Sequence, residues 1–232
     1  MNRDEAKHNP SQHSSSIRSL FNQVSPHYDL MNDLMSFALH RHWKNIAIDL
    51  GLLRSSHKIL DLASGTGDLA IRIIKYLDNT GSLICVDPSE GMFGHGRDRM
   101  LDNGYLKNVN WCCASAENLP FQKHFFDRIF VGFGFRNFTD HLHSLKEMHR
   151  VLLPGGMALI LEFSNIHSPL FKKLYSQYTK IIPKLGKCIS QKENQYQYLI
   201  DSIAAVLMVS FLSEDECLSM SDLKALLKTL AG

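Results

Sequence analysis

The sequence has few cysteines and no CxxC pair, which limits both its redox chemistry and its metal chemistry. Its five cysteines are an odd number, so they cannot all pair in a disulfide framework. This pattern is typical of a reduced, cytoplasmic protein whose cysteines are ordinary small core residues. His141 and His143 have no cysteine or further ligand beside them at metal-binding spacing, so we expect no metal site.

Long hydrophobic runs are also missing. The most apolar stretch, IAAVLMVSFL at residues 203–212, has about half of the ~20 residues that a helix needs to cross a bilayer. Residues 1–16 are polar and lack the apolar region of a secretory signal, so we interpret them as a disordered tail. The sequence therefore predicts no membrane-spanning helix and a single domain over residues 17–232.

No large excess of charge of one sign is present. The 25 basic and 23 acidic residues give a formal net charge of +2, so nucleic acid is not an expected partner. Residues 164–192 nevertheless contain six lysines and no acidic residue. We interpret 164–202 as an insertion on the substrate side, whose basic stretch makes transient contact with the inner face of a membrane. A solvated basic face is the alternative, and the expected location is cytoplasmic with peripheral membrane association.

Apolar residues follow two different periodicities along the rest of the chain. The strand-like segments are 58–63, 82–87, 109–114, 127–133 and 157–163. Helical patterns separate these segments, and this alternation predicts a Rossmann-like α/β fold with a mostly parallel sheet. The helix expected over 140–153 should stop at Pro154-Gly155-Gly156. Residues 17–55 have the apolar spacing of helices, which we expect to form an N-terminal lid.

The first strand leads into a glycine loop. Gly65-Thr66-Gly67 fits the G-x-G-x-x-G/A pattern of nucleotide-binding sites, and Asp87 follows the second strand. Glycines let the backbone approach a ligand, and a carboxylate after the second strand accepts hydrogen bonds from ribose hydroxyls. The pattern alone does not distinguish NAD, FAD and S-adenosylmethionine.

The charges around this loop distinguish the ligands better. The loop has no lysine or arginine, whereas Asp61 and Asp68 flank it. Acidic residues disfavour the doubly negative pyrophosphate of a dinucleotide and suit S-adenosylmethionine, which carries an ammonium and a sulfonium. The residues therefore favour a methyl donor. Structural roles are compatible with this interpretation: Asp68 as the N-cap of the next helix, and Asp61 as a hydrogen-bond partner of the loop.

Six motifs along the chain carry a resemblance to a known family. They are YDLMNDLMSFALHRHW (28–43), LDLASGTGD (60–68), AENLPF (116–121), FGFRNFTD (133–140), RVLLPGGMALILEFS (150–164) and YQYLIDSI (196–203). In this order they resemble the UbiE/MenG/Coq5 family of quinone-biosynthesis C-methyltransferases over about residues 17–203. The resemblance implies a class I methyltransferase fold, S-adenosyl-L-methionine as cofactor and C-methylation of a demethylated polyprenyl quinol. The acceptor would be demethylmenaquinol, which we favour, or 2-methoxy-6-polyprenyl-benzoquinol.

The resemblance also assigns the donor site. It places Gly65, Thr66 and Gly67 in the loop, Asp87 at the ribose, and Ser115 and Ala116 beside the adenine. The family usually has Asn at position 115 and often Ser at position 132, where this chain has Gly132, so we expect backbone contacts there. After residue 203 the chain departs from the family, in which two further strands complete a seven-stranded sheet. Either residues 206–212 replace part of a strand, or the C-terminal strands are incomplete at one edge of the sheet.

Three residues are candidates for catalysis. Arg136 follows the fourth strand, where it can lower the pKa of a quinol hydroxyl and stabilise developing negative charge, while Asn137 orients the ring. The structural alternative is an ion pair for Arg136 and a turn for Asn137. His40 is either a general base or a residue that fixes the lid.

Two other functions remain open on the sequence alone. One is an NAD-dependent oxidoreductase, which the glycine loop would also serve. The other is a cofactor-binding module with impaired catalysis, which the changed adenine-side residues and the divergent C-terminal region would explain. We also consider a homodimer.

Overall fold

The computed structural model describes residues 39–105, 107–164 and 205–213. Its helices are α3 (Leu39–Leu50), α4 (Asp68–Ile73), α5 (Glu90–Asp102) and α6 (His141–Val151), with the 3-10 helices η2 (Ile74–Tyr76) and η3 (Phe135–Asn137). Its strands are β1 (Lys58–Leu62), β2 (Ser82–Val86), β3 (Val109–Cys112), β4 (Phe126–Gly132), β5 (Leu152–Ser164) and β6 (Ala205–Ser213).

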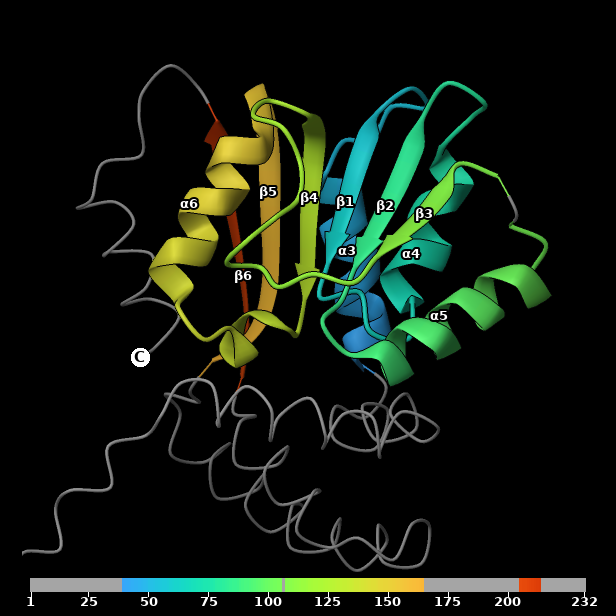
Figure 1. Cartoon of the computed structure of the whole chain (residues 1–232), viewed down its shortest axis with the longest axis horizontal. Helices are drawn as coiled ribbons and strands as arrows, with labels where there is room; N and C mark the ends of the chain where they lie inside the picture. The colour runs from blue at the N-terminus through green and yellow to red at the C-terminus, as the bar shows by residue number, and fades with distance from the viewer. Residues whose placement is uncertain (1–38, 106, 165–204, 214–232) are drawn as a thin grey trace, which may run out of the picture.

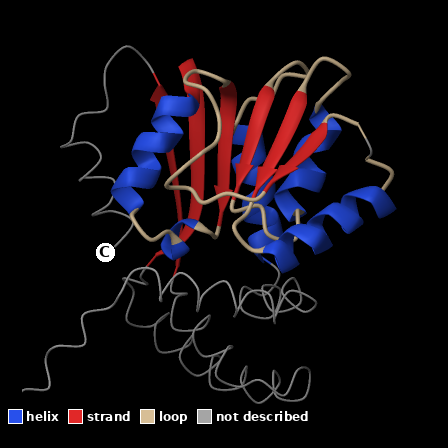
Figure 2. Ribbon diagram, in the orientation of Figure 1, coloured by secondary structure: helices blue, strands red, loops and turns tan. Residues whose placement is uncertain are grey.

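The described strands form one sheet in the order β3-β2-β1-β4-β5-β6 (Figure 1, Figure 2). β1 pairs in parallel with β2 on one side and with β4 on the other, and β3 and β5 extend the parallel part. The order therefore reverses at β1, and the loops after β1 and β4 diverge at the carboxyl edge. This arrangement confirms the predicted Rossmann-like fold, and β1 to β4 begin and end within two residues of their predicted limits.

Neighbouring residues of the central strands pack against helices on opposite faces of the sheet. Leu60 of β1 lies in one core cluster with Leu145 of α6. Ile59 faces the other way and lies in a second cluster with Ile48 of α3 and Ile73 of α4. Figure 1 shows α6 on one side of the sheet and α3 and α4 on the other. Because helices cover both faces, the strands are near-continuous apolar runs.

The predicted stop at Pro154-Gly155-Gly156 is only partly right. α6 ends before this sequence, but β5 begins directly after the helix and runs through it. Leu152 pairs with Phe126, whereas Met157 pairs with Arg128. The Pro-Gly-Gly sequence is therefore an irregularity within the strand, where a proline that cannot donate a hydrogen bond is tolerated.

The apolar run 206–212 lies within β6. This strand pairs antiparallel with β5, from Gly156 opposite Ser213 to Ser164 opposite Ala205. The run therefore supplies a strand next to β5, as the first alternative states. The predicted incompleteness of the C-terminal strands stays a prediction, because residues 214–232 lie outside the described residues.

Several predicted segments lie outside the described residues. These are the tail 1–16, the lid region up to residue 38, and the insertion 164–202 apart from its first residue. α3 confirms a helix in the remaining part of 17–55. Within the described ranges, no helix is long and apolar enough to cross a bilayer.

Two glycines of α5 provide a matched test of the packing around β3. A Cβ at Gly96 would lie 2.5 Å from Cη2 of Trp111 and 3.0 Å from the carbonyl oxygen of Gly65, whereas the site of a Cβ at Gly94 is open. We expect Gly96→Ala to lower the free energy of unfolding by about 1–3 kcal/mol, because α5 must move away from β3 and the glycine loop. Gly94→Ala should raise it by up to about 1 kcal/mol, because alanine favours the helix. Urea unfolding measures both, and equal stability of the two variants would contradict this packing.

Candidate functional site

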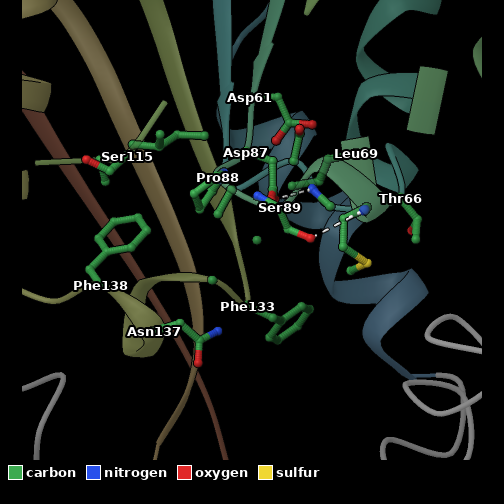
Figure 3. Close-up of a pocket in the computed structure, with 18 of the residues that line it drawn as sticks. Asp61, Thr66, Leu69, Asp87, Pro88, Ser89, Ser115, Phe133, Asn137 and Phe138 are labelled. Atoms are coloured by element: carbon green, nitrogen blue, oxygen red, sulfur yellow. Dashed lines mark hydrogen bonds between the residues drawn. The ribbon is translucent and has the colours of Figure 1, made fainter. Parts of the chain in front are cut away.

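A cavity opens at the carboxyl edge of the sheet, where the loops after β1 and β4 diverge (Figure 3). Its walls come from the loops that follow β1, β2, β3 and β4, and from α3. Together with the open solvent at its mouth, the space has a volume of about 1040 Å³. Figure 3 shows Asp61 and Asp87 on one side, and Ser115, Asn137 and Phe138 on the other.

Residues with positive φ shape the glycine loop. Ala63, Gly65 and Gly67 have φ values of 57°, 54° and 74°, so the chain turns sharply between β1 and α4. Gly65 and Thr66 line the cavity, but Gly67 does not. Gly67 is the N-cap of α4, and a Cβ there would lie 3.3 Å from Cη2 of Trp111. Two of the three predicted loop residues therefore lie at the cavity, and the third closes the turn.

Asp87 is the carboxylate that holds this loop in place. Its Oδ2 accepts a hydrogen bond from the Gly65 amide at 2.9 Å, and its Oδ1 accepts one from the Ser89 amide at 2.8 Å. Asp87 is buried just after β2 and lines the cavity. Because each carboxylate oxygen has two lone pairs, Asp87 has room to accept further hydrogen bonds. Its contact with ribose hydroxyls stays a prediction.

The carboxyl group of Asp61 is fully buried, and neither of its oxygens has a hydrogen-bond partner among the described residues. The predicted hydrogen bond to the loop is therefore absent, and the Ala70 amide lies near enough to affect the pKa but not in hydrogen-bonding geometry. Burial raises the pKa of Asp61 to about 8; Lys44 opposes this shift, and the charges of Asp87 and Asp68 add to it. A buried carboxyl of this kind favours a cationic ligand beside it.

Asp68 has the opposite electrostatic environment. Nζ of Lys44 lies 2.9 Å from its Oδ2, and Arg72 and Arg99 approach its Oδ1 at 3.4 and 3.5 Å. Burial alone would raise the pKa of Asp68, but these cations, Lys44 most strongly, hold it well below its ordinary value. Asp68 is thus the first residue of α4 and the centre of a charge cluster; the N-cap is Gly67, which corrects the predicted capping role.

This cluster also corrects the charge argument made from the sequence. The loop itself has no basic residue, but three cations reach Asp68 from α3, α4 and α5. The charge of Asp68 is therefore neutralised within the protein. The negative charge of the cavity therefore rests on Asp87, because burial favours the neutral form of Asp61.

The opposite wall contains the residues predicted beside the adenine. Ser115 and Ala116 both line the cavity, and Glu117 follows them. Oε1 of Glu117 accepts hydrogen bonds from the amides of Thr139 at 2.7 Å and Asp140 at 3.2 Å. The loop after β3 and the loop before α6 are thereby joined along this wall.

The three candidate catalytic residues occupy different positions. Asn137 lines the cavity, whereas Arg136 and His40 do not. The guanidinium of Arg136 forms an ion pair with Glu162 at 2.6 Å, as in the structural alternative. His40 is buried on α3. The structure thus brings Asn137 to the site, and the catalytic roles of Arg136 and His40 stay predictions.

Two further residues of the cavity carry no sequence-based assignment. Lys44 shares the buried side of α3 with Ala47 and Ile48, and a lysine among the buried positions of an amphipathic helix is the available signal for it. Its Nζ lies 5.8 Å from the ring centroid of Phe133. Phe133 has a φ of 60°, a strained conformation for an aromatic residue that no sequence pattern predicts.

Together these features define the kind of ligand that fits. The glycine loop brings the backbone to the cavity, Asp87 can hold a ribose, and the buried Asp61 favours a positive charge nearby. S-adenosylmethionine combines adenosine with an ammonium and a sulfonium, so these residues fit it. The fold and the site define an α/β protein that binds S-adenosylmethionine at the point where the strand order reverses.

The chain belongs to the ubiE/COQ5 methyltransferase family, whose model matches residues 8–212. It is 45% identical over 193 residues to the ubiquinone/menaquinone biosynthesis C-methyltransferase UbiE of Coxiella burnetii, covering 83% of this chain and 77% of that protein. It is 44% identical over 188 residues to the protein of the same name from Methylococcus capsulatus, covering 81% and 76%. The resemblance seen in the six motifs is confirmed, and S-adenosylmethionine is the cofactor.

Solved structures share the fold at lower identity. A SAM-dependent methyltransferase from Aquifex aeolicus matches with a TM-score of 0.50 and 22% identity, over 54% of this chain and 66% of that one. The cyclase SpnF matches with a TM-score of 0.56 and 20% identity, over 64% and 60%. Because one of these neighbours is a cyclase, the fold by itself does not define methyl transfer.

Asp61 should give the protein a distinctive pH dependence of stability. Its pKa is raised from 3.8 to about 8 by folding, so the folded state keeps a proton that the unfolded state releases above about pH 4. The stability from this group is fully present below that pH and is lost as the pH rises through about 8. Asp61→Asn is neutral at every pH. We therefore expect its free energy of unfolding, relative to that of the parent, to rise by on the order of 4 kcal/mol between pH 4 and pH 7.

Urea unfolding of both proteins between pH 4 and pH 8 measures this difference. Asp102→Asn, at an exposed position of α5, is the matched control, and its stability should run parallel to that of the parent. If the difference in free energy of unfolding between Asp61→Asn and the parent does not change with pH across this range, Asp61 is ionised in the folded protein.

Proposed function

We propose that the protein transfers a methyl group from S-adenosylmethionine to a ring carbon of a demethylated polyprenyl quinol. The first acceptor that we propose is demethylmenaquinol, which would become menaquinol, and the second is 2-methoxy-6-polyprenyl-benzoquinol. The family and the names of the Coxiella and Methylococcus relatives support this reaction. The observation that carries the proposal is a single cavity that extends from Asp87, on the donor side, to Asn137 and Phe138.

The donor side is formed by α3 and the loops after β1 and β2, with Ser115 and Ala116 of the loop after β3 as the proposed neighbours of the adenine. Asp87 would accept hydrogen bonds from the ribose, while Gly65 and Thr66 offer backbone contacts. Asp61 and Lys44 both line this part of the cavity, and they suit the ammonium and the carboxylate of an amino acid group. A cation beside Asp61 would lower its pKa and so favour its charged form. S-adenosylmethionine, when bound, supplies a methyl group on a positively charged sulfur.

On the acceptor side the protein positions the ring and handles protons. A quinol carbon becomes nucleophilic when the neighbouring hydroxyl gains phenolate character, and that carbon gives up its own proton once it is methylated. The carboxamide of Asn137 lines the cavity and can donate to or accept from a quinol oxygen. Arg136 carries the positive charge that would stabilise the developing phenolate, and His40 is the candidate to accept the proton.

The proposed place of the reaction is the cytoplasm, with transient contact at the inner face of the membrane. A polyprenyl chain dissolves in a bilayer, so the enzyme must reach the quinol ring at the lipid surface. The lysine-rich composition of residues 164–192 supports such contact, and all of that stretch except its first residue lies outside the described residues. A homodimer stays a prediction from the sequence.

The two rival functions gain no support from the site. A dinucleotide oxidoreductase needs a favourable place for a pyrophosphate, whereas here the carboxylate of Asp87 lies beside the glycine loop and accepts its Gly65 amide. A binding module with impaired catalysis would not need the acceptor wall, yet Asn137 and Phe138 line the same cavity as the donor loop.

Replacement of Asp87 tests the donor site. We expect Asp87→Ala to lower the affinity for S-adenosylmethionine by about 10- to 100-fold, because it removes a charged acceptor for the ribose and the anchor of the Gly65 amide. Titration calorimetry measures this change. Glu90→Gln, at an exposed position nearby, is the control and should bind as tightly as the parent. Unchanged affinity in Asp87→Ala would place the ribose elsewhere.

Transfer of a labelled methyl group tests the reaction itself. The protein is incubated with methyl-labelled S-adenosylmethionine and each reduced quinone, and mass spectrometry identifies the acceptor that gains the label. We expect label in demethylmenaquinol, because its hydroxyl activates the adjacent ring carbon. The oxidised quinones are the matched control and should gain none, since their ring carbons are not nucleophilic. A protein that binds the donor but labels neither quinol would refute the proposed function.

A further inference from the structure

Glu162 is a buried carboxylate to which neither the sequence nor the proposed reaction assigns a role. It lies near the carboxyl end of β5, is 2% exposed, and is not among the residues that line the cavity. β5 pairs with β4 and contacts η3, the short helix that follows β4. A buried charge is costly unless it is paired and hydrogen-bonded, so the partners of Glu162 indicate what it does.

Both oxygens of Glu162 contact one residue of η3. Oε2 accepts a hydrogen bond from the main-chain amide of Arg136 at 3.0 Å, and Oε1 accepts one from Nη1 of Arg136 at 2.6 Å. The Arg136 side chain is itself largely buried, with 15% exposed. A single carboxylate therefore ties both the backbone and the side chain of Arg136 to β5.

The two contacts between Glu162 and Arg136 also affect how Asn137, the next residue, is oriented. Arg136 and Asn137 share the single turn of η3, in which the Asn137 amide donates to the Gly134 carbonyl at 3.1 Å. Asn137 then lines the cavity, on the side opposite Asp87 (Figure 3). A 3-10 turn of three residues has few hydrogen bonds of its own, so an anchor on a neighbouring strand determines how it is oriented.

Stability is a weak explanation for this ion pair. The cost of removing two charges from water offsets most of their attraction, so a buried pair contributes little compared with apolar residues of similar size. The pair instead fixes the orientation of the Arg136 guanidinium, because the N–H donors of arginine form a rigid planar fork. A carboxylate that also accepts the main-chain amide fixes that fork relative to the turn.

We infer that Glu162 is a positioning residue for the methyl acceptor, which holds Arg136 and, through η3, Asn137 in the orientation that the quinol needs. This inference rests on the proposed function. Glu162 itself contacts neither donor nor acceptor in this scheme. Its loss should therefore affect turnover of the quinol and spare donor binding, because Gly65, Thr66 and Asp87, the main donor residues, lie on other loops.

The test introduces Glu162→Gln into two backgrounds, the parent and Arg136→Met. Glutamine keeps the shape and one acceptor oxygen but removes the charge. In the parent, we expect kcat with demethylmenaquinol to fall by about 10- to 100-fold, because small displacements of positioning groups are costly to rate. The Kd for S-adenosylmethionine should change by less than about twofold. In Arg136→Met the same substitution should change kcat by less than about twofold, because the glutamine oxygen can still accept the main-chain amide of residue 136 and no guanidinium is left to direct.

Two further variants separate positioning from general stability. Glu162→Asp keeps the charge on a shorter side chain and should recover part of the lost kcat. Glu147→Gln is the matched control, because Glu147 also joins a main-chain amide, that of Leu119, to an arginine, Arg150. None of these last three residues lines the cavity, so Glu147→Gln should lower Tm and leave kcat unchanged.

Three outcomes would overturn the inference. They are an unchanged kcat in Glu162→Gln, an equal loss of kcat in both backgrounds, and a loss of donor affinity as large as the loss of kcat. The last two would mean that Glu162 acts on the whole fold. If the parent binds the donor but labels neither quinol, the proposed function is refuted, together with the inference that rests on it. The three outcomes above differ from this one because they are seen with a parent that is active.

Discussion

The pairing of β1 between β2 and β4 determines where this protein can bind a ligand. Because the strand order reverses at β1, the loops that follow β1 and β4 separate and leave a space at the carboxyl edge of the sheet. Close to the strand ends these two loops nearly touch, since a Cβ at Gly134 would lie 2.5 Å from the Cβ of Ala63. Ala63 and Phe133, the residues that leave the two strands, both have positive φ. The site is therefore built on strained turns that the surrounding sheet holds in place.

Three aspartates around one loop have three different environments. Asp68 is held in its charged form by three cations, Asp87 accepts two main-chain amides, and burial favours the neutral form of Asp61. Position in the fold sets these differences, because the side chains are chemically identical. Burial thus keeps the Asp61 carboxyl group largely neutral, and a cation bound beside it would lower its pKa.

Most of the fold is predictable from local patterns, and much of the site is not. β1 to β4 follow from short apolar runs, and the glycine loop with Asp87 follows from a motif whose spacing reflects backbone geometry. The role of Gly67 and the course of β5 through Pro-Gly-Gly depend on contacts with Trp111 and β4, which are distant in sequence. A buried position on an amphipathic helix is a sequence signal for Lys44, but its partner Asp68 and the partner of Glu162 depend on how α3 and β5 pack. For the same reason, the sequence of the loop does not predict the three cations around Asp68, which come from α3, α4 and α5.

The antiparallel course of β6 places the two ends of a long segment together. Ser164 and Ala205 are partners in the sheet, so residues 165–204 leave it and return to it at one point on the edge where the cavity opens. The entropy lost in closing such a segment grows only with the logarithm of its length. A change in the length of the connection between β5 and β6 should therefore add little to the entropy cost of pairing these two strands.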